Sequence, residues 1–285
     1  MKTLSLTAAS VIALSAGSAF ADGHAGTMGY ALANDGMTLV TMASIAAPSE
    51  IATFDLASKL DAIAYRPVTG DLLGYSNGTI YSVNAATGAL TDLGATFMDD
   101  AMVMDGAVAT AMDFNNKIDA VRMVGSDGTN LVYFPDGFGD MDERAGSVRK
   151  FTSTFYVEGD NSEGAIPEIF ANAYTNAISG MKAESTAQYA LDSQANALVS
   201  LANNAGELAT IGLITIDGEA ADVIPMGGFD IVSSEEGTDA AYAILQLDGA
   251  DTAGLYAMDL ETGAATLLAD LGMGGFTGFA VSAGM

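Results

Sequence analysis

The chain of 285 residues contains no cysteine and carries 36 acidic side chains against 9 basic ones, a formal net charge of −27 at pH 7. The lack of cysteine excludes disulfide bonds, thiol nucleophiles and thiolate metal sites. The negative charge opposes binding to anionic membrane surfaces and excludes nucleic acid as a partner, because no basic cluster is present to neutralise phosphates. Half of the residues are hydrophobic, so the chain can bury a large core.

The first 21 residues have the pattern of a cleavable secretory signal peptide. Lys2 provides the positive start, an apolar stretch covers residues 4–16, and the small-x-small motif at residues 19–21 predicts cleavage before Asp22. The apolar stretch is too short to span a bilayer, and no later one approaches about 20 residues. We therefore expect an exported protein, periplasmic or secreted, without a membrane anchor.

A short pattern recurs in the rest of the chain. The segment IYSVNAATGALTDLG at residues 80–94 recurs as LVSLANNAGELATIG at 198–212 and as LYAMDLETGAATLLADLG at 255–272, with a weaker copy from Leu131. Each full copy has strand-like alternation on both sides of a turn that contains glycine, which predicts a β-hairpin.

Two more strand-like segments precede each hairpin, so the repeating unit has four strands. In chain order these pairs are residues 59–67 and 71–77, 108–115 and 118–126, 169–176 and 185–193, and 227–233 and 240–247. Four such units with loops of variable length are typical of the blades of a β-propeller.

The two chain ends supply a fifth unit. Residues 275–282 resemble the first strand of a blade, and residues 28–35 and 37–45 resemble later strands. We therefore predict an all-β fold, a five-bladed propeller of four-stranded blades closed by strands from both termini, in which no sheet edge is left open. Residues 28–285 would form this single domain, after a flexible tail at 22–27; the alternative is one long antiparallel sandwich.

The repeats resemble bacterial exported proteins that carry the domain of unknown function DUF4394. The resemblance lies in residues 62–94, 112–137 and 156–176, and in GGFDIV followed later by GLYAMDLETGAATLL. It implies a propeller-like protein outside the cytoplasm and brings no assigned reaction.

The first strands of the five units line the central channel of a propeller, and their alignment selects candidate site residues. Asp113 and Asp230 align with Ala64, Ala173 and Ala280. The next residue of each strand is expected to be in the core. These core residues are Tyr65, Phe114, Tyr174, Ile231 and Val281. Arg66, Asn115 and Thr175 lie two residues further along their strands. We expect these side chains to complete a polar face in the channel. Arg66 could hold a carboxylate or sugar hydroxyls, and Asp113 and Asp230 could act as general acid and base. The alternative is a structural plug in which Arg66 neutralises both aspartates.

Catalysis or metal binding through histidine within the fold is excluded, because His24 is the single histidine and lies in the predicted tail. No cofactor is expected apart from calcium. Two acidic loops could bind this cation, although neither has EF-hand spacing and both could be solvated turns. Their candidate ligands are Asp136, Asp140, Asp142 and Glu143 in one, and Glu158, Asp160, Asn161 and Glu163 in the other.

Three functions are compatible with these features. The first is a non-catalytic binding module that presents its channel mouth or loops to an unknown protein or glycan. The second is a hydrolase or lyase that acts on a carbohydrate or lactone with Asp113, Asp230 and Arg66. The third is a structural component of the envelope or matrix.

Overall fold

The structure is a computed structural model that describes residues 26–98, 101 and 107–283. The predicted signal peptide, His24 and residues 22–25 of the predicted tail lie outside the described residues. The first strand, β1, begins at Thr27, which is buried and thus belongs to the folded domain rather than to a tail.

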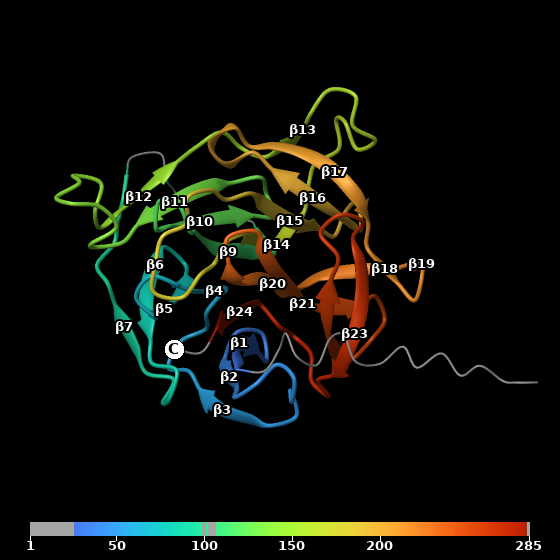
Figure 1. Cartoon of the computed structure of the whole chain (residues 1–285), viewed down its shortest axis with the longest axis horizontal. Helices are drawn as coiled ribbons and strands as arrows, with labels where there is room; N and C mark the ends of the chain where they lie inside the picture. The colour runs from blue at the N-terminus through green and yellow to red at the C-terminus, as the bar shows by residue number, and fades with distance from the viewer. Residues whose placement is uncertain (1–25, 99–100, 102–106, 284–285) are drawn as a thin grey trace, which may run out of the picture.

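Five sheets, each with four antiparallel strands, are arranged in a ring, as Figure 1 shows, and we name them blades 1 to 5. Blade 1 consists of β4 (Ala62–Tyr65), β5 (Leu72–Ser76), β6 (Thr79–Val83) and β7 (Leu90–Asp92). Blade 2 consists of β9 (Thr110–Asn115), β10 (Ala120–Gly125), β11 (Asn130–Phe134) and β12 (Ser147–Lys150). Blade 3 consists of β14 (Ile169–Tyr174), β15 (Gln188–Asp192), β16 (Ala197–Leu201) and β17 (Glu207–Leu213). Blade 4 consists of β20 (Val223–Glu235), β21 (Thr238–Leu247), β22 (Ala253–Met258) and β23 (Ala264–Asp270).

Blade 5 is built from both chain ends and confirms the predicted closure. Its order is β24 (Gly278–Ala283), β1 (Thr27–Ala33), β2 (Thr38–Met42) and β3 (Ile51–Asp55). The C-terminal strand β24 pairs with the N-terminal β1 from Thr27 opposite Ala283 to Leu32 opposite Gly278. The inner strands β4, β9, β14, β20 and β24 contact one another in that order, and β24 contacts β4 again, so the ring is closed.

Blades 2, 3 and 4 carry outer strands that the repeat pattern did not predict. The short strands β8 (Thr96–Phe97), β13 (Phe155–Tyr156) and β18 (Thr215–Ile216) each precede the inner strand of their blade. They pair parallel with the outermost repeat strands β12, β17 and β23, and β19 (Glu219–Ala220) pairs with β18. These strands cover edges that would otherwise be open.

The core lies between the blades. Five hydrophobic clusters fill the five spaces between neighbouring blades, and a smaller sixth lies within blade 2. The residues predicted to be core on the inner strands are all buried, from Tyr174 at 0% exposed to Tyr65 at 8%.

In the part of the chain that the structure describes, the single helical segment is the short 3₁₀ turn Asn203–Ala205, and no helix there is long and apolar enough to cross a membrane.

One connection runs across the channel at the end where the inner strands finish. This crossing loop, residues 175–187, joins β14 to β15 and is the yellow segment near β4 and β6 in Figure 1. The amide of Gly180 donates to the carbonyl of Pro67 in blade 1 at 2.8 Å, and that of Ala183 to Asn116 in blade 2 at 3.0 Å. The amide of Ser233 in blade 4 donates to the carbonyl of Ala177 at 3.1 Å. The loop thus covers this end of the channel.

Candidate functional site

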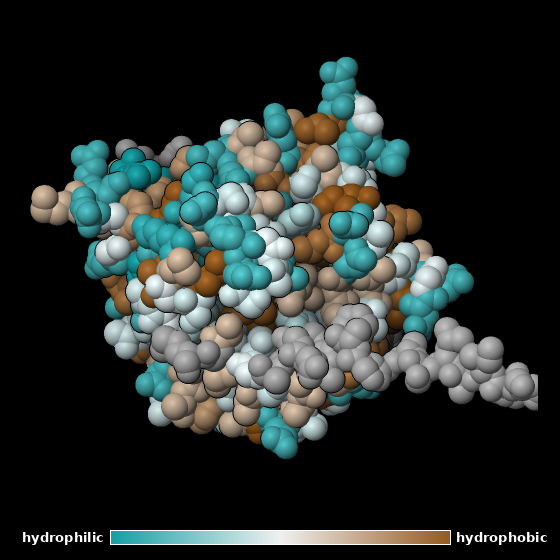
Figure 2. Space-filling model, viewed as in Figure 1, coloured by the Kyte–Doolittle hydropathy of each residue, from teal (hydrophilic) through white to brown (hydrophobic). Residues whose placement is uncertain are grey.

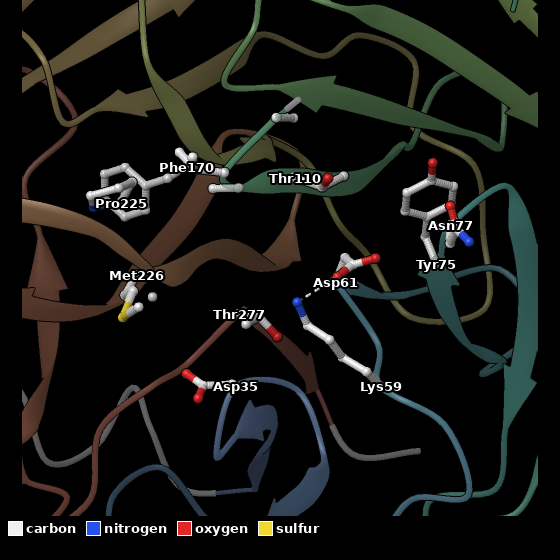
Figure 3. Close-up of a pocket in the computed structure, with 14 residues that line it drawn as sticks. Asp35, Lys59, Asp61, Tyr75, Asn77, Thr110, Phe170, Pro225, Met226 and Thr277 are labelled. Carbon is white, nitrogen blue, oxygen red and sulfur yellow. Dashed lines mark ion pairs between the residues drawn. The ribbon is translucent and has the colours of Figure 1, made fainter. Parts of the chain in front are cut away.

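A funnel of about 420 Å³ opens at the other end of the channel, where the inner strands begin. Figure 3 shows the labelled side chains around an open space, with apolar groups on one side and polar groups opposite. The apolar side has Phe170, Pro225 and Met226. The remaining labelled residues are Asp35, Lys59, Asp61, Tyr75, Asn77, Thr110 and Thr277.

Most of the polar residues come from turns and from the connections that lead into inner strands, whereas Tyr75 lies on β5 and Thr110 begins β9. Asp35 lies in the turn between β1 and β2 with a φ of 54°, a left-handed conformation that aspartate tolerates better than most residues. Its amide donates to the carbonyl of Gly275 at 2.8 Å, which joins the turn to the segment before β24. Lys59 and Asp61 precede β4 and form an ion pair at 3.0 Å. This pair neutralises the lysine and leaves Asp35 as an unpaired charge among the described funnel residues.

The channel narrows below the funnel. Thr110 and Phe170 line the funnel and also a void of about 10 Å³ deeper in the ring. All five inner strands contribute to the walls of this void, through Ile63, Met112, Asn172, Phe229 and Phe279 among others. The void has space for about one water-sized group.

Asp113 and Asp230 lie beyond the void and join neighbouring blades. Both side chains are 4% exposed. Asp113 Oδ2 accepts the amide of Tyr174 in blade 3 at 2.6 Å, and Asp230 Oδ2 accepts the amide of Val281 in blade 5 at 2.6 Å. Each also accepts the amide of its own successor, Phe114 or Ile231. The two carboxylates therefore bind backbone donors that the open edges of inner strands would leave unpaired.

Burial makes these two carboxyl groups weak acids. Desolvation raises the pKa of Asp230 to about 7, although its two amide bonds oppose the shift. Desolvation also raises the pKa of Asp113 well above its usual value, with a further increase from the charge of Asp230.

Arg66 does not join Asp113 and Asp230, so the predicted neutral plug is not formed. Its guanidinium makes a bidentate ion pair with Asp119, from Nε to Oδ1 at 2.8 Å and from Nη2 to Oδ2 at 2.5 Å. Arg66 is 6% exposed and Asp119 is 1% exposed. Asp119 lies in the turn between β9 and β10, so this pair joins blade 1 to blade 2 near the covered end of the channel.

The other two residues of the predicted polar face serve turns and blade contacts. Asn115 Oδ1 accepts the amides of Lys117 and Ile118, and its Nδ2 donates to Asn203 Oδ1 at 3.2 Å. Thr175 begins the crossing loop, and its Oγ1 accepts the amide of Ala187 at 2.9 Å. Neither residue lines the funnel.

The two acidic loops project from the ring, where hydrophilic residues gather (Figures 1 and 2). Among the described residues, no group of three or more acidic or histidine side chains lies close enough to hold a metal ion. Asp142 pairs with Arg144 at 2.7 Å, and hydrogen bonds from Arg144 lower the pKa of Asp142 to about 2. Asp160 accepts the amide and hydroxyl of Thr210 in blade 3. The remaining candidate calcium ligands are exposed, and those that the structure describes form no cluster that could hold a cation. They are Asp136, Asp140, Glu143, Glu158, Asn161 and Glu163.

Comparison with known proteins places the chain in a family. Residues 37–280 match the model of the domain of unknown function DUF4394, which covers most of the chain. The chain belongs to the DUF4394 family. No curated protein matches the sequence of this DUF4394 protein.

Solved structures similar to the DUF4394 protein include a calcium-binding protein, regucalcin, from Agrobacterium tumefaciens, with 14% identity, a TM-score of 0.39, and coverage of 81% of this chain and 66% of that one. A protein of unknown function from Bacteroides caccae has 9% identity and a TM-score of 0.41, with 90% and 98% covered. An auxiliary nutrient binding protein from Bacteroides ovatus has 13% identity and a TM-score of 0.42, with 75% and 55% covered. The match thus spans less than two thirds of regucalcin and about half of the nutrient binding protein.

Reasoning from the repeats missed the funnel of the DUF4394 protein. Most of its polar residues lie in connections that differ between blades, so alignment of the repeats does not select them. A usable signal was the position of Lys59 and Asp61 directly before an inner strand, since Lys59 is one of only 9 basic residues in the chain.

Proposed function

We propose that this protein is a non-catalytic binding module, and that its funnel binds a neutral saccharide unit of a glycan outside the cytoplasm, in the periplasm or after secretion. A funnel of about 420 Å³ is within the usual range for small-molecule sites. The crossing loop covers the opposite end of the channel, which favours a blind binding site over a passage.

The observation that carries the proposal is the two-sided lining of the funnel. Sugars have apolar C–H faces and a rim of hydroxyl groups. Pro225 and Met226 offer an apolar surface beside the buried Phe170, and the carboxylates of Asp35 and Asp61 lie opposite as hydrogen-bond acceptors (Figure 3). A protein of net charge −27 repels anionic ligands, which favours neutral sugars over phosphorylated or acidic ones.

The alternative of a carbohydrate- or lactone-active hydrolase or lyase is less well supported. Asp113 and Asp230 are each 4% exposed and lie behind a void of about 10 Å³, so a sugar in the funnel would not contact them. Arg66, the third candidate, is paired with Asp119. General acid–base catalysis requires a carboxyl group within hydrogen-bond reach of the reacting atoms.

Titration calorimetry with methyl α-D-glucopyranoside, galactopyranoside and mannopyranoside tests the proposal. We expect at least one sugar to bind, and Asp35→Asn to weaken that binding by about tenfold, because a hydrogen bond to a charged group contributes roughly 1.5–3 kcal/mol. The asparagine keeps the left-handed turn conformation, so the fold should be unchanged. Asp55→Asn, which removes an equal charge on the exposed edge strand β3, is the matched control and should leave affinity unchanged. Equal effects of the two variants, or no binding of any of the three sugars, would refute the proposal.

A further inference from the structure

Asn172 is a polar residue in an otherwise apolar position of the ring. It lies on the inner strand β14 and is 1% exposed. The aligned residues of the other inner strands are Ile63, Met112, Phe229 and Phe279. Core packing alone would therefore favour an apolar side chain at this position of blade 3 as well.

The amide group of Asn172 has no hydrogen-bond partner in the described part of the chain. Neither Oδ1 nor Nδ2 is bonded to any described residue, although both atoms are buried. Buried amide atoms are nearly always bonded, and each unbonded one lowers stability. Asn172 therefore lowers stability at a position where the other four inner strands have apolar residues, which indicates a functional requirement for its amide.

The position of Asn172 connects this amide with the funnel. Asn172 lines the void of about 10 Å³ whose other walls include Thr110 and Phe170, and these two residues also line the funnel. The pairing of β14 with β15 shifts register between Ile169 and Ala171, beside Phe170. Such irregularities redirect side chains and are common next to binding sites. The void is therefore a small, mainly apolar extension beneath the funnel floor, with the amide of Asn172 in its wall.

We propose that Asn172 is the residue that recognises the primary hydroxyl group of a hexose, which enters the void while the rest of the sugar stays in the funnel. This inference rests on the proposed function and specifies its ligand. A hydroxyl group both donates and accepts, so it satisfies Oδ1 and Nδ2 together. A carboxylate cannot donate to Oδ1, and an ammonium group cannot accept from Nδ2. The void has space for about one water-sized group, which excludes an acetamido substituent.

The binding test compares each methyl hexopyranoside with its 6-deoxy counterpart, which lacks the primary hydroxyl. The wild-type protein should bind the hexoside at least about tenfold more tightly, because the deoxy sugar leaves both amide atoms unbonded. Asn172→Leu, which has similar volume, should abolish this preference. Asp35→Asn should weaken both sugars while retaining the preference. If Asn172→Leu retains the preference, or if the wild type shows none, the inference is wrong although the funnel still binds sugar. If no sugar binds, the proposed function fails together with it.

A stability measurement separates ligand recognition from a permanent structural role. If the amide is free in the unliganded protein, Asn172→Leu should raise the melting temperature by about 2–4 °C, because two unbonded polar atoms are replaced by apolar ones. A fall in melting temperature of similar size would show that a resident water or another group already satisfies the amide, and would overturn the inference.

Discussion

Removal of the Asp119 carboxylate is expected to lower the free energy of unfolding by about 3–5 kcal/mol. Its bidentate pair with Arg66 is buried, with exposed fractions of 1% for Asp119 and 6% for Arg66. In Asp119→Ala the guanidinium would remain buried and lose both of its hydrogen bonds to this carboxylate, which is far more costly than the loss of an exposed pair. Urea unfolding followed by circular dichroism measures the difference.

Asp71 provides the matched control for this variant. Its Oδ2 lies 3.8 Å from Nη1 of the same Arg66, but its side chain is 54% exposed. Asp71→Ala should therefore lower the free energy of unfolding by less than about 1 kcal/mol. Similar losses for the two variants would mean that Asp119 does not anchor blade 2 to blade 1.

Stability is expected to rise as the pH falls from 8 to 5, because the channel carboxyl groups bind protons more tightly in the folded state. The pKa of Asp230 is raised to about 7 by burial, from near 4 in the unfolded chain, so the folded state gains a proton first. For Asp230 the gain is on the order of 3 kcal/mol over this range, from 1.36 kcal/mol per pKa unit. Asp113 shifts in the same direction and adds to the effect.

Asp230→Asn should flatten this pH dependence in two ways. It removes one titrating group, and it removes the charge that helps to raise the pKa of Asp113. An ordinary carboxyl group titrates near pH 4, so the range from pH 8 to 5 separates the channel pair from surface groups. Urea unfolding at several pH values measures the slope, and Asp61→Asn, in the partly exposed pair with Lys59, is the control that should retain it. A wild-type protein that loses stability toward pH 5 would contradict the assignment.

The repeat pattern was sufficient to predict the ring, because each blade repeats the same alternation and turn chemistry and because residues 275–282 and 28–45 supply complementary strands. The outer strands β8 and β18 were missed, since two-residue strands have no alternation to detect. Alignment of the inner strands selected Asp113 and Asp230, but their amide partners depend on distances between blades that no local pattern encodes. The Arg66 partner was missed for the same reason, since Asp119 is 53 residues away on a turn.

Asn172 is the candidate-site residue that the sequence could have provided. The same alignment that selected Asp113 places it one position earlier, beside Ile63, Met112, Phe229 and Phe279. Its polarity is visible there, but its missing hydrogen bonds become evident only when burial is known. The alignment of inner strands gives no such signal for Asp35, because it lies in a turn whose sequence does not repeat from blade to blade.

A crystal structure of the protein soaked with the methyl hexopyranoside that binds most tightly tests the central claim most directly. We expect the sugar in the funnel between Asp35 and Phe170, with its primary hydroxyl within hydrogen-bond distance of both amide atoms of Asn172. Sugar bound instead to the projecting loops would contradict the assignment of the funnel as the recognition site. Sugar in the funnel with its primary hydroxyl pointing to solvent would contradict the role of Asn172.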